Sequence, residues 1–371
     1  MDLEPFHLER YFARHEFSAR YLLSSSDCEA LSLAELLDLA DDECRRLWEG
    51  LRLGYTESLG LPLLREEVAR LYQGVTADEV IEVVPEEGIL LAMVTLLEPG
   101  DHVIVTWPGY QTLYGIARQM GCEVTYWQPD EEAGWRFDVD DVRRALRPTT
   151  RLIVVNMPHN PTGSLLSRED FEALLALADE AGVTVFSDEM YRWLEQDPSR
   201  LLPAAVERSP RAVTLCGLSK TFSLPGLRVG WLVTHDRDAY RRLAAAKDYT
   251  TICGSAPGEV LAVVALRHAA AIAARNRERV AANSARFARF VAAHPDLFSW
   301  TPPAAGSIAL ARLRAPEGAT AFCDRLVEEA GVMLLPASVF GYGDGHVRIG
   351  LGRDTFAAGL AELEAWLARR R

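Results

Sequence analysis

A lysine in the second half of the sequence lies in a setting that would make its amine a nucleophile. Lys220 follows Ser219 and precedes a Pro-Gly turn that leads to Arg228. A lysine amine forms a Schiff base with an aldehyde, and a nearby arginine can hold an anionic group of the same molecule. The segment predicts a covalent site for pyridoxal phosphate, with Lys220 as the catalytic residue and with Ser219 and Arg228 at the phosphate.

A loop-forming segment upstream supports this interpretation. Residues 156–163 read Asn-Met-Pro-His-Asn-Pro-Thr-Gly and follow an apolar run. Two prolines and a glycine predict a rigid loop that fixes Asn160, whose amide could donate a hydrogen bond to the ring oxygen of the cofactor. Asn-Pro also marks ordinary turns, but the complete octapeptide after an apolar strand favours a binding site.

A third segment ends a buried strand with a carboxylate. Asp188 and Tyr191 lie in the sequence Ser-Asp-Glu-Met-Tyr, directly after the apolar residues 183–186. A buried carboxylate is costly unless it meets a cation or a strong donor, and a protonated pyridine nitrogen would be such a partner. We expect Asp188 at this nitrogen and Tyr191 at the ring oxygen beside Asn160. The alternative for Asp188 alone is a cap of the next helix.

The elements that must position these residues are strands alternating with helices. Short apolar runs rich in Val and Ile are typical of buried parallel strands, and amphipathic stretches such as the one after Ser167 predict the helices between them. The runs are residues 102–106, 123–127, 152–156, 184–187, 212–216 and 230–234. This alternation predicts an α/β fold with a mostly parallel central sheet covered by helices, and ligands bind at the carboxyl ends of such strands.

The pattern changes after Asp236. We expect a long helical region over residues 257–293, strands at 307–313, 332–336 and 347–351, and helices near 320–330 and 355–369. The first fifty residues are mainly helical, without a strand ladder of their own. These features predict a large cofactor-binding domain at residues 50–285 and a smaller α/β domain from residues 1–49 and 286–371.

Composition narrows the functional class. The chain has 371 residues, is 49% hydrophobic and carries a net charge of −14, so it has no basic footprint for nucleic acid. No apolar run reaches transmembrane length, and the acidic N-terminus is unlike a signal peptide. Six cysteines without C-x-x-C pairing predict free thiols and no metal site. We therefore expect a cytoplasmic enzyme without nucleic-acid or membrane partners.

Taken together, the three motifs resemble the class I/II aminotransferases, which are pyridoxal-phosphate enzymes of fold type I. The resemblance covers nearly the whole chain, and some segments look like those of capreomycidine-synthase-like members. It implies a homodimer that uses amino-acid and 2-oxo-acid substrates. It also implies that Tyr110 stacks on the cofactor ring, that Tyr55 reaches the phosphate of the partner subunit, and that Arg348 binds the substrate carboxylate with Asn160. A core tyrosine and a strand-edge arginine are the alternatives for Tyr110 and Arg348.

Two segments depart from the pattern of the family. Glu86 and Glu87 stand where many relatives have a Gly-Ala-x-Glu turn at the phosphate, and Gly217 stands where many have a hydroxyl. Since a carboxylate beside a phosphate is unfavourable, we expect main-chain rather than side-chain contacts from Glu86 and Glu87. Ser219 and Arg228 must then supply more of the phosphate binding.

The reaction expected from the resemblance is transamination of an L-amino acid, with the freed Lys220 amine as the general base. The same scaffold could instead perform elimination, cyclisation or oxidation of an arginine-like amino acid. Ser26 is expected at the substrate, and Asp27 or Glu16 could meet a cationic side chain. The alternative is that the serines near Asp27 and Asp27 itself cap a helix that begins near Leu31.

Two further expectations concern arginine and DNA. Arg353 is expected to be solvated, and the absence of an arginine around residues 247–259 argues against dicarboxylic substrates. A sensor domain that binds the cofactor without turnover is a remote alternative. The residues before Tyr55 are too few and too acidic for a DNA-binding domain, which disfavours it.

Overall fold

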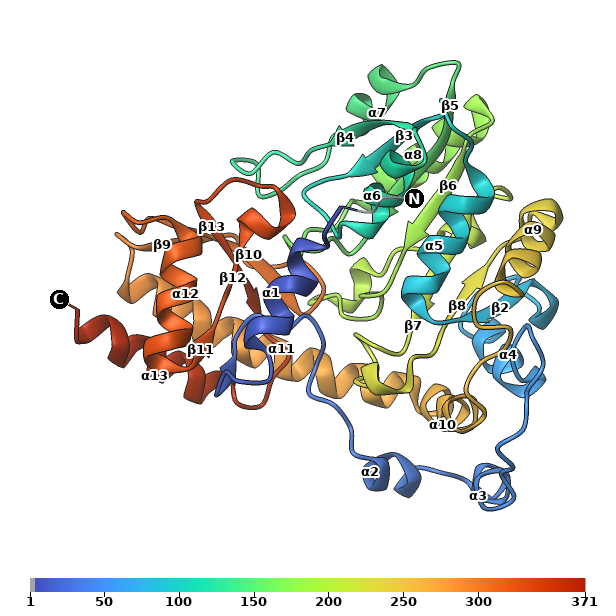
Figure 1. The fold of residues 1–371 in the computed structure, drawn as a ribbon, viewed down its shortest axis with the longest axis horizontal. Coiled ribbons are helices and arrows are strands. Elements are labelled where there is room, and N and C mark those ends of the chain that lie inside the picture. The colour runs from blue at the N-terminus through green and yellow to red at the C-terminus, as the bar shows by residue number, and fades with distance from the viewer. Residues whose placement is uncertain (1–3, 371) are drawn as a thin grey trace.

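A seven-stranded sheet forms the centre of the larger part of the structure, a computed structural model that describes residues 4–370 (Figure 1). The strands are β2 (Val80–Val83), β3 (His102–Thr106), β4 (Glu123–Trp127), β5 (Thr150–Asn156), β6 (Thr184–Asp188), β7 (Val213–Gly217) and β8 (Gly230–Val233). Their order is β2-β8-β7-β6-β5-β3-β4. Strand β8 runs antiparallel to both of its neighbours, β2 and β7, and the other pairs in the sheet are parallel. The predicted mostly parallel sheet is confirmed.

Both faces of this sheet are buried because alternate side chains of each strand meet different helices. On one face Val103 and Val154 pack with residues of α5 (Pro85–Leu96), α6 (Thr112–Gln119) and α9 (Arg237–Lys247). On the other face Ile104 and Ile153 pack with α7 (Val139–Ala145) and α8 (Arg168–Ala181). This period-two burial explains the continuous apolar runs in the sequence. Helix α8 begins as predicted after Ser167, whose Oγ accepts a hydrogen bond from the Asp170 N–H at 2.9 Å.

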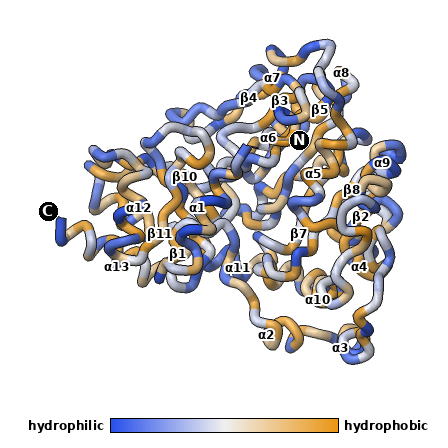
Figure 2. The backbone as a smooth tube through the Cα atoms, in the orientation of Figure 1, coloured by the Kyte–Doolittle hydropathy of each residue, from blue (hydrophilic) through white to orange (hydrophobic). Residues whose placement is uncertain are grey.

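The same sheet is covered near β7 and β8 by α4 (Pro62–Ala69) and α10 (Ala256–Arg267). Figure 2 shows the hydrophobic segments of α5 and α10, which are consistent with their buried positions. The predicted helical region 257–293 is two helices, because α10 ends at Arg267, His268 caps it, and α11 (Ala269–Ala293) then follows. Within residues 4–370 no single helix is long and apolar enough to cross a membrane; α10 and α11 pass that test only as a pair bent by 77°.

The C-terminal part forms a second, antiparallel sheet joined to the first part by α11 (Figure 1). Its strands, in the order β12-β13-β10-β9, are β9 (Phe298–Trp300), β10 (Ile308–Leu313), β12 (Leu335–Pro336) and β13 (His346–Gly350). Helices α12 (Ala319–Ala330) and α13 (Phe356–Ala368) share its hydrophobic core. The two helices and the strands near 307–313 and 347–351 are confirmed, and β9 is an addition. The strand expected at 332–336 is instead two short strands, residues 332–333 and β12, which belong to different sheets.

The N-terminal residues divide between the two parts. Helix α1 (His7–His15) packs in the C-terminal core, and β1 (Tyr21–Leu22) pairs with β11 (Val332–Met333). In contrast, α2 (Leu33–Asp38) and α3 (Asp42–Glu49) contact α10. The division into residues 50–285 and residues 1–49 with 286–371 stays a prediction.

Candidate active site

The carboxyl ends of β5 and β6 bring two predicted motifs together. Asn156 and Asp188 are direct partners in the parallel register. The Asn156 side chain donates to the main-chain oxygen of Asp188 at 3.1 Å and accepts from the N–H of Asn160 at 2.7 Å. Asn156 therefore ties the Asn160 loop to the strand that carries Asp188. Sequence reasoning placed Asn156 in the motif but gave it no role.

Asp188 is a buried carboxyl with little local compensation. Its side chain is 6% exposed, and Oδ1 accepts one hydrogen bond from the Met190 N–H at 3.2 Å. Burial raises the pKa of Asp188 to about 7, against the opposing effects of the Met190 hydrogen bond and the Lys220 charge. A protonated ring nitrogen would supply the cation that this environment lacks.

Lys220 enters the same space from the loop after β7. Its Nζ donates to Ser26 Oγ at 2.9 Å. Burial lowers the pKa of Lys220; the charge of Asp27 opposes this shift, and that of Arg348 adds to it. A lowered pKa increases the fraction of neutral, nucleophilic amine. Ser26, expected at the substrate, therefore lies within hydrogen-bond distance of this amine, and its contact with a substrate stays a prediction.

Arg348 is almost fully buried, and its guanidinium has N–H groups that remain available for a ligand. The side chain is 1% exposed, and burial lowers its pKa. Nε and Nη2 donate to the Ser24 carbonyl at 3.2 and 2.9 Å, and Nη1 donates to Asn160 Oδ1 at 3.2 Å. Since a guanidinium carries five N–H groups, these contacts leave donors for a carboxylate. The strand-edge surface alternative for Arg348 is wrong.

Residues 24–27 line the site and do not cap a helix. Helix α2 is capped by Ser32, whose Oγ accepts from the Glu35 N–H at 3.2 Å, so the capping interpretation of the upstream serines is wrong. Asp27 pairs with Arg353 at 2.9 Å, and the Arg353 side chain is only 17% exposed. The expectation that Arg353 is solvated is therefore wrong, because it neutralises Asp27.

Two tyrosines border the same space. Tyr191 is buried, and its hydroxyl has no hydrogen-bond partner among residues 4–370. Such an orphaned hydroxyl suits a ring oxygen of the expected cofactor. Tyr110 donates to Glu9 Oε1 at 3.3 Å, and its ring lies 4.9 Å from that of Phe6. Burial, assisted by the charges of Glu86 and Glu9, raises the pKa of Tyr110, so its hydroxyl stays protonated.

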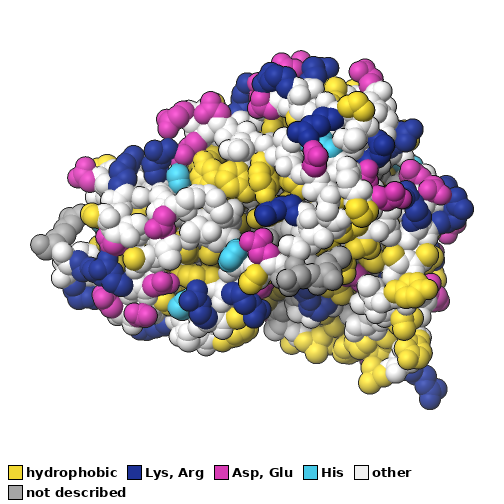
Figure 3. Space-filling view, turned by 45° about the horizontal axis from the view of Figure 1, so that its top comes forward, with side chains coloured by type: hydrophobic (Ala, Val, Ile, Leu, Met, Phe, Trp, Pro, Cys, Tyr) yellow, Lys and Arg dark blue, Asp and Glu magenta, His cyan; other side chains and the backbone are white. Residues whose placement is uncertain are grey.

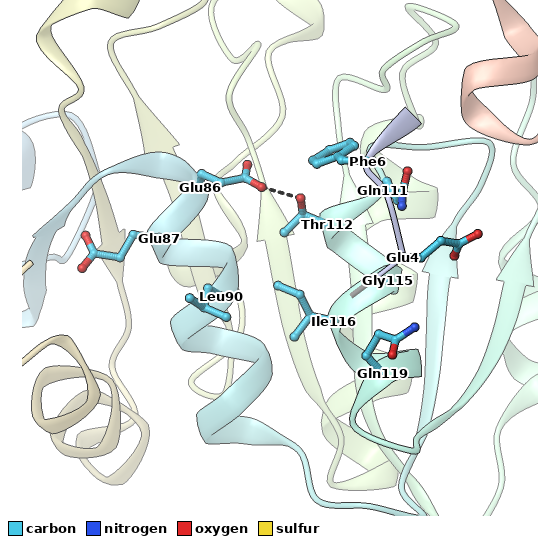
Figure 4. A pocket seen from close by; sticks show the side chains of 10 residues that line it. All are labelled: Glu4, Phe6, Glu86, Glu87, Leu90, Gln111, Thr112, Gly115, Ile116 and Gln119. Atoms are coloured by element: carbon cyan, nitrogen blue, oxygen red, sulfur yellow. Dashed lines mark hydrogen bonds between the residues drawn. The ribbon is translucent and has the colours of Figure 1, made fainter. Parts of the chain in front are cut away.

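The first turn of α5 has main-chain N–H groups without a helical acceptor, and the contact of Glu86 and Glu87 with a phosphate stays a prediction. Pro85 has no N–H, and the Val84 N–H donates to Glu87 Oε2 at 3.1 Å. The N–H groups of Glu86 and Glu87 lie in the first turn, where no α-helical acceptor exists. Figure 4 shows the two carboxylates pointing apart, with Glu86 hydrogen-bonded to Thr112.

A mostly apolar cavity of about 290 Å³ lies beside this turn, between α5 and α6. Glu86 and Glu87 line it together with Leu90 and Ile116, and Phe6 covers part of it (Figure 4). The catalytic lysine does not line this cavity. We assign the chemistry to the strand-end residues and not to this apolar space.

Gly217 is explained by the close approach of Pro85. A Cβ atom on Gly217 would lie 2.9 Å from the Gly230 Cα and 3.1 Å from the Pro85 Cγ. A serine or threonine therefore cannot fit without a shift of the backbone. Gly217 thus allows β7 to approach both β8 and Pro85, the residue that begins α5.

The remaining predicted residues differ in exposure. Ser219 is buried, whereas Arg228 is exposed and donates to the Pro225 carbonyl at 3.0 Å. The Arg228 charge lowers the pKa of Glu86, which burial raises, so the arginine lies near the α5 turn. Tyr55 is 92% exposed and lies outside the cluster formed by its own chain. Its assignment to the phosphate of a partner subunit stays a prediction.

The described residues fit pyridoxal phosphate. The site combines a lysine of lowered pKa, a buried carboxyl without a cation and an orphaned tyrosine hydroxyl. Lys220 would hold the cofactor covalently, Asp188 would face its ring nitrogen, and Tyr191 its ring oxygen. The three side chains therefore match the aldehyde, the ring nitrogen and the ring oxygen of the cofactor.

Known proteins share this fold and sequence. Residues 22–358 match the family "Aminotransferase class I and II". Capreomycidine synthase of Streptomyces vinaceus is 33% identical over 364 residues, covering 97% of this chain and 91% of the relative. A PLP-dependent aminotransferase from Streptococcus suis has a TM-score of 0.93 at 34% identity, covering 100% of this chain and 99% of that chain.

A second solved structure, the PLP-dependent cyclase OrfR, has a TM-score of 0.90 at 30% identity and covers 100% of this chain and 99% of that chain. Aminotransferases and a cyclase thus share both the fold and the sequence pattern of this protein. The chain belongs to the class I and II aminotransferase family, has the fold type I arrangement, and is an enzyme whose cofactor is pyridoxal phosphate.

Proposed function

We propose that the protein is an aminotransferase that moves the amino group of an L-amino acid to a 2-oxo acid. The observation that carries this proposal is the Lys220 amine of lowered pKa, held 2.9 Å from Ser26 and acted on by the charges of Arg348 and Asp188. An amine in this state can remove the α-proton of a substrate and return it.

Each residue of the site would have a separate task. The two free donors of Arg348 would bind the substrate carboxylate as a pair, which fixes the position of the α-carbon. Bound pyridoxal phosphate supplies the aldehyde that takes up the amino group and an electron-withdrawing ring that acidifies the α-proton. Asp188 would keep positive charge at the ring nitrogen, and Lys220 would move the proton. Asn156 would hold the Asn160 loop in place beside Asp188 and Lys220.

A homodimer completes the proposal. Large hydrophobic side chains are exposed at Leu53, Tyr55, Tyr249 and Ile252. Figure 3 shows hydrophobic side chains gathered on a projecting part of the molecule, at the lower right. A second copy of the chain would cover such a surface. Tyr55 could then reach the neighbouring site, as the family resemblance implies.

A second candidate is cyclisation, elimination or oxidation of an arginine-like amino acid. Acidic groups beside Lys220 favour a cationic substrate. Burial raises the pKa of Glu16, as do Asp27 and Glu9, whereas Arg353 and Lys220 lower it. Because Asp27 is already paired with Arg353, the carboxylates left for a cationic side chain are Glu9 and Glu16. Capreomycidine synthase and the cyclase OrfR are relatives whose names fit this candidate.

Product analysis distinguishes the two candidates. Purified protein loaded with pyridoxal phosphate would be mixed with single amino acids, and its visible spectrum and products followed. Release of a 2-oxo acid together with pyridoxamine phosphate supports the aminotransferase and names its donor. Ammonia, a cyclic product or oxygen consumption without pyridoxamine phosphate supports the second candidate. A protein that binds the cofactor but changes none of the amino acids would favour the sensor alternative.

A further inference from the structure

A group of buried charged side chains lies behind the first turn of α5. It consists of Glu82 on β2, Glu87 on α5, Lys247 at the end of α9 and Glu259 on α10, and none of these side chains is more than 9% exposed. We call it the buried charge cluster. Burial of three carboxyl groups with one lysine costs desolvation free energy, so we expect a structural role for the cluster. None of these side chains has a chemical task in the reaction proposed above.

Thr251 links the lysine of this cluster to α5. Lys247 Nζ donates to Thr251 Oγ1 at 2.7 Å, and Thr251 Oγ1 donates in turn to Glu87 Oε1 at 2.8 Å. The Thr251 N–H also donates to Glu87 Oε1, at 3.2 Å. Glu87 then uses Oε2 to hold the Val84 N–H at the start of the helix. One hydroxyl thus connects a buried cation to the carboxylate that shapes the first turn of α5.

The other end of the cluster reaches the segment that carries Tyr55. Thr56 Oγ1 donates to Glu259 Oε1 at 3.2 Å. A Cβ on Gly254 would lie 2.6 Å from Glu259 Oε1 and 2.8 Å from Glu82 Oε2, so the carboxylates of β2 and α10 close on this glycine. Each linking threonine is adjacent or close in sequence to an exposed aromatic side chain, Tyr55 or Tyr249.

We propose that Thr251 is a positioning residue which, through Lys247 and Glu87, fixes the first turn of α5 to receive the phosphate of the cofactor. This inference rests on the proposed function, because it assumes that the Glu86 and Glu87 N–H groups bind that phosphate. Thr251 and the Thr250 hydroxyl hold one oxygen of Glu87, and the Val84 N–H holds the other, so this side chain restrains the turn. The N–H groups then keep one direction toward an anion.

The test compares two ligands that differ only in the phosphate. Apoprotein would be titrated with pyridoxal phosphate and with pyridoxal, and the absorbance of the bound ligand followed. In Thr251→Val the bridging hydroxyl is lost, and we expect the dissociation constant for pyridoxal phosphate to rise about tenfold. The constant for pyridoxal should change less than about twofold, because no phosphate contact is involved.

Two comparisons make the result specific. Thr251→Ser keeps the hydroxyl and should restore phosphate selectivity relative to Thr251→Ala, a pair that remains informative where the valine variant does not fold. Thr95→Val is the matched control, because Thr95 lies on α5 far from its first turn and its Oγ1 donates to the Leu91 carbonyl at 2.6 Å. It should bind both ligands like the wild type.

The outcomes separate this inference from the function on which it rests. Equal weakening of pyridoxal phosphate and pyridoxal in the Thr251 variants would overturn the positioning role and leave the proposed function intact. A wild-type chain that binds neither ligand would overturn both. Selective loss of pyridoxal phosphate binding, rescued by serine, supports the positioning role.

Discussion

Lys220 and Asp188 lie in the same site, where their charges attract each other although the surroundings favour the neutral form of each group. Burial lowers the pKa of the lysine and raises that of the aspartate to about 7. Both shifts favour the neutral form of the group, whereas the charge of each group favours the charged form of the other. The surroundings therefore favour a cationic partner for Asp188 and the neutral form of the Lys220 amine.

Replacement of Asp188 tests this balance. Asp188→Asn keeps the shape but cannot carry negative charge, so we expect kcat to fall about a hundredfold or more, as for other losses of electrostatic stabilisation. Covalent binding of pyridoxal phosphate at Lys220, seen by its absorption band, should persist. An activity within about threefold of the wild type would contradict the assignment of Asp188 to the ring nitrogen.

Glu16 tests the second candidate function. Glu16→Gln removes a charge near Lys220, and we expect kcat/KM for arginine relative to alanine to fall about tenfold if a cationic substrate is used. Glu66→Gln is the control, because Glu66 is exposed on α4 and the same charge is lost. An unchanged preference in the Glu16 variant, matching the control, argues for a neutral substrate.

At the scale of elements, Gly217 lies where α5 packs against β7 and β8, at a position where many family members have a hydroxyl residue. Gly217→Ser would restore the common hydroxyl, but its Cβ would lie 2.9 Å from the Gly230 Cα. We expect a loss of about 1–3 kcal/mol in the free energy of unfolding, measured in denaturant. Gly345→Ser is the control, since nothing lies within 4 Å of its Cβ position. Equal stability of the two variants would show that Pro85 yields to the hydroxyl.

The buried charge cluster predicts how stability depends on pH. Burial raises the pKa values of both Glu82 and Glu259 to about 7, although Lys247 lowers the first. The nearby charges of Glu87 and Glu57 add to these shifts. A carboxyl whose pKa is raised by folding stabilises the fold below its unfolded pKa, and this contribution is lost as pH rises through the folded pKa.

The free energy of unfolding should therefore fall between pH 5 and pH 8. Glu82→Gln removes one of these titrations, so the fall should be smaller in this variant than in the wild type, whatever its stability at pH 5. Chemical denaturation at both pH values measures the difference. An identical fall in the two proteins would mean that Glu82 titrates normally.

The sequence predicted elements better than it predicted their directions or their contacts with the main chain. Strand runs and strand-end motifs have local signals, so the positions of Asp188 and Asn160 followed from them. The direction of β8 depends on its pairing with β2 and β7, which leaves no local trace. The sequence likewise did not predict the contact of Arg348 with the Ser24 carbonyl or the pairing of Asp27 with Arg353. A main-chain oxygen has no residue signature, and the paired residues lie 326 positions apart in sequence.

At the scale of the whole molecule, the site formed by one chain lacks one predicted contributor. Tyr55 is 92% exposed, and Tyr249 and Ile252 are also exposed apolar side chains. In a symmetric dimer the same surface of each subunit meets its counterpart, so each Tyr55 would serve the Lys220 of the other subunit. Light scattering of the loaded enzyme should give a dimer.

Mixing two damaged subunits tests this sharing directly. Lys220→Ala removes the catalytic amine, and Tyr55→Ala is expected to bind pyridoxal phosphate weakly. Unfolding and refolding the two variants together at equal amounts gives half mixed dimers, each with one site that holds both Lys220 and the partner's Tyr55. Activity should recover to about a quarter of the wild-type value at limiting cofactor. Mixed dimers without recovered activity would mean that Tyr55 serves the site of its own chain or no site, because only exchange between subunits can pair the two intact residues.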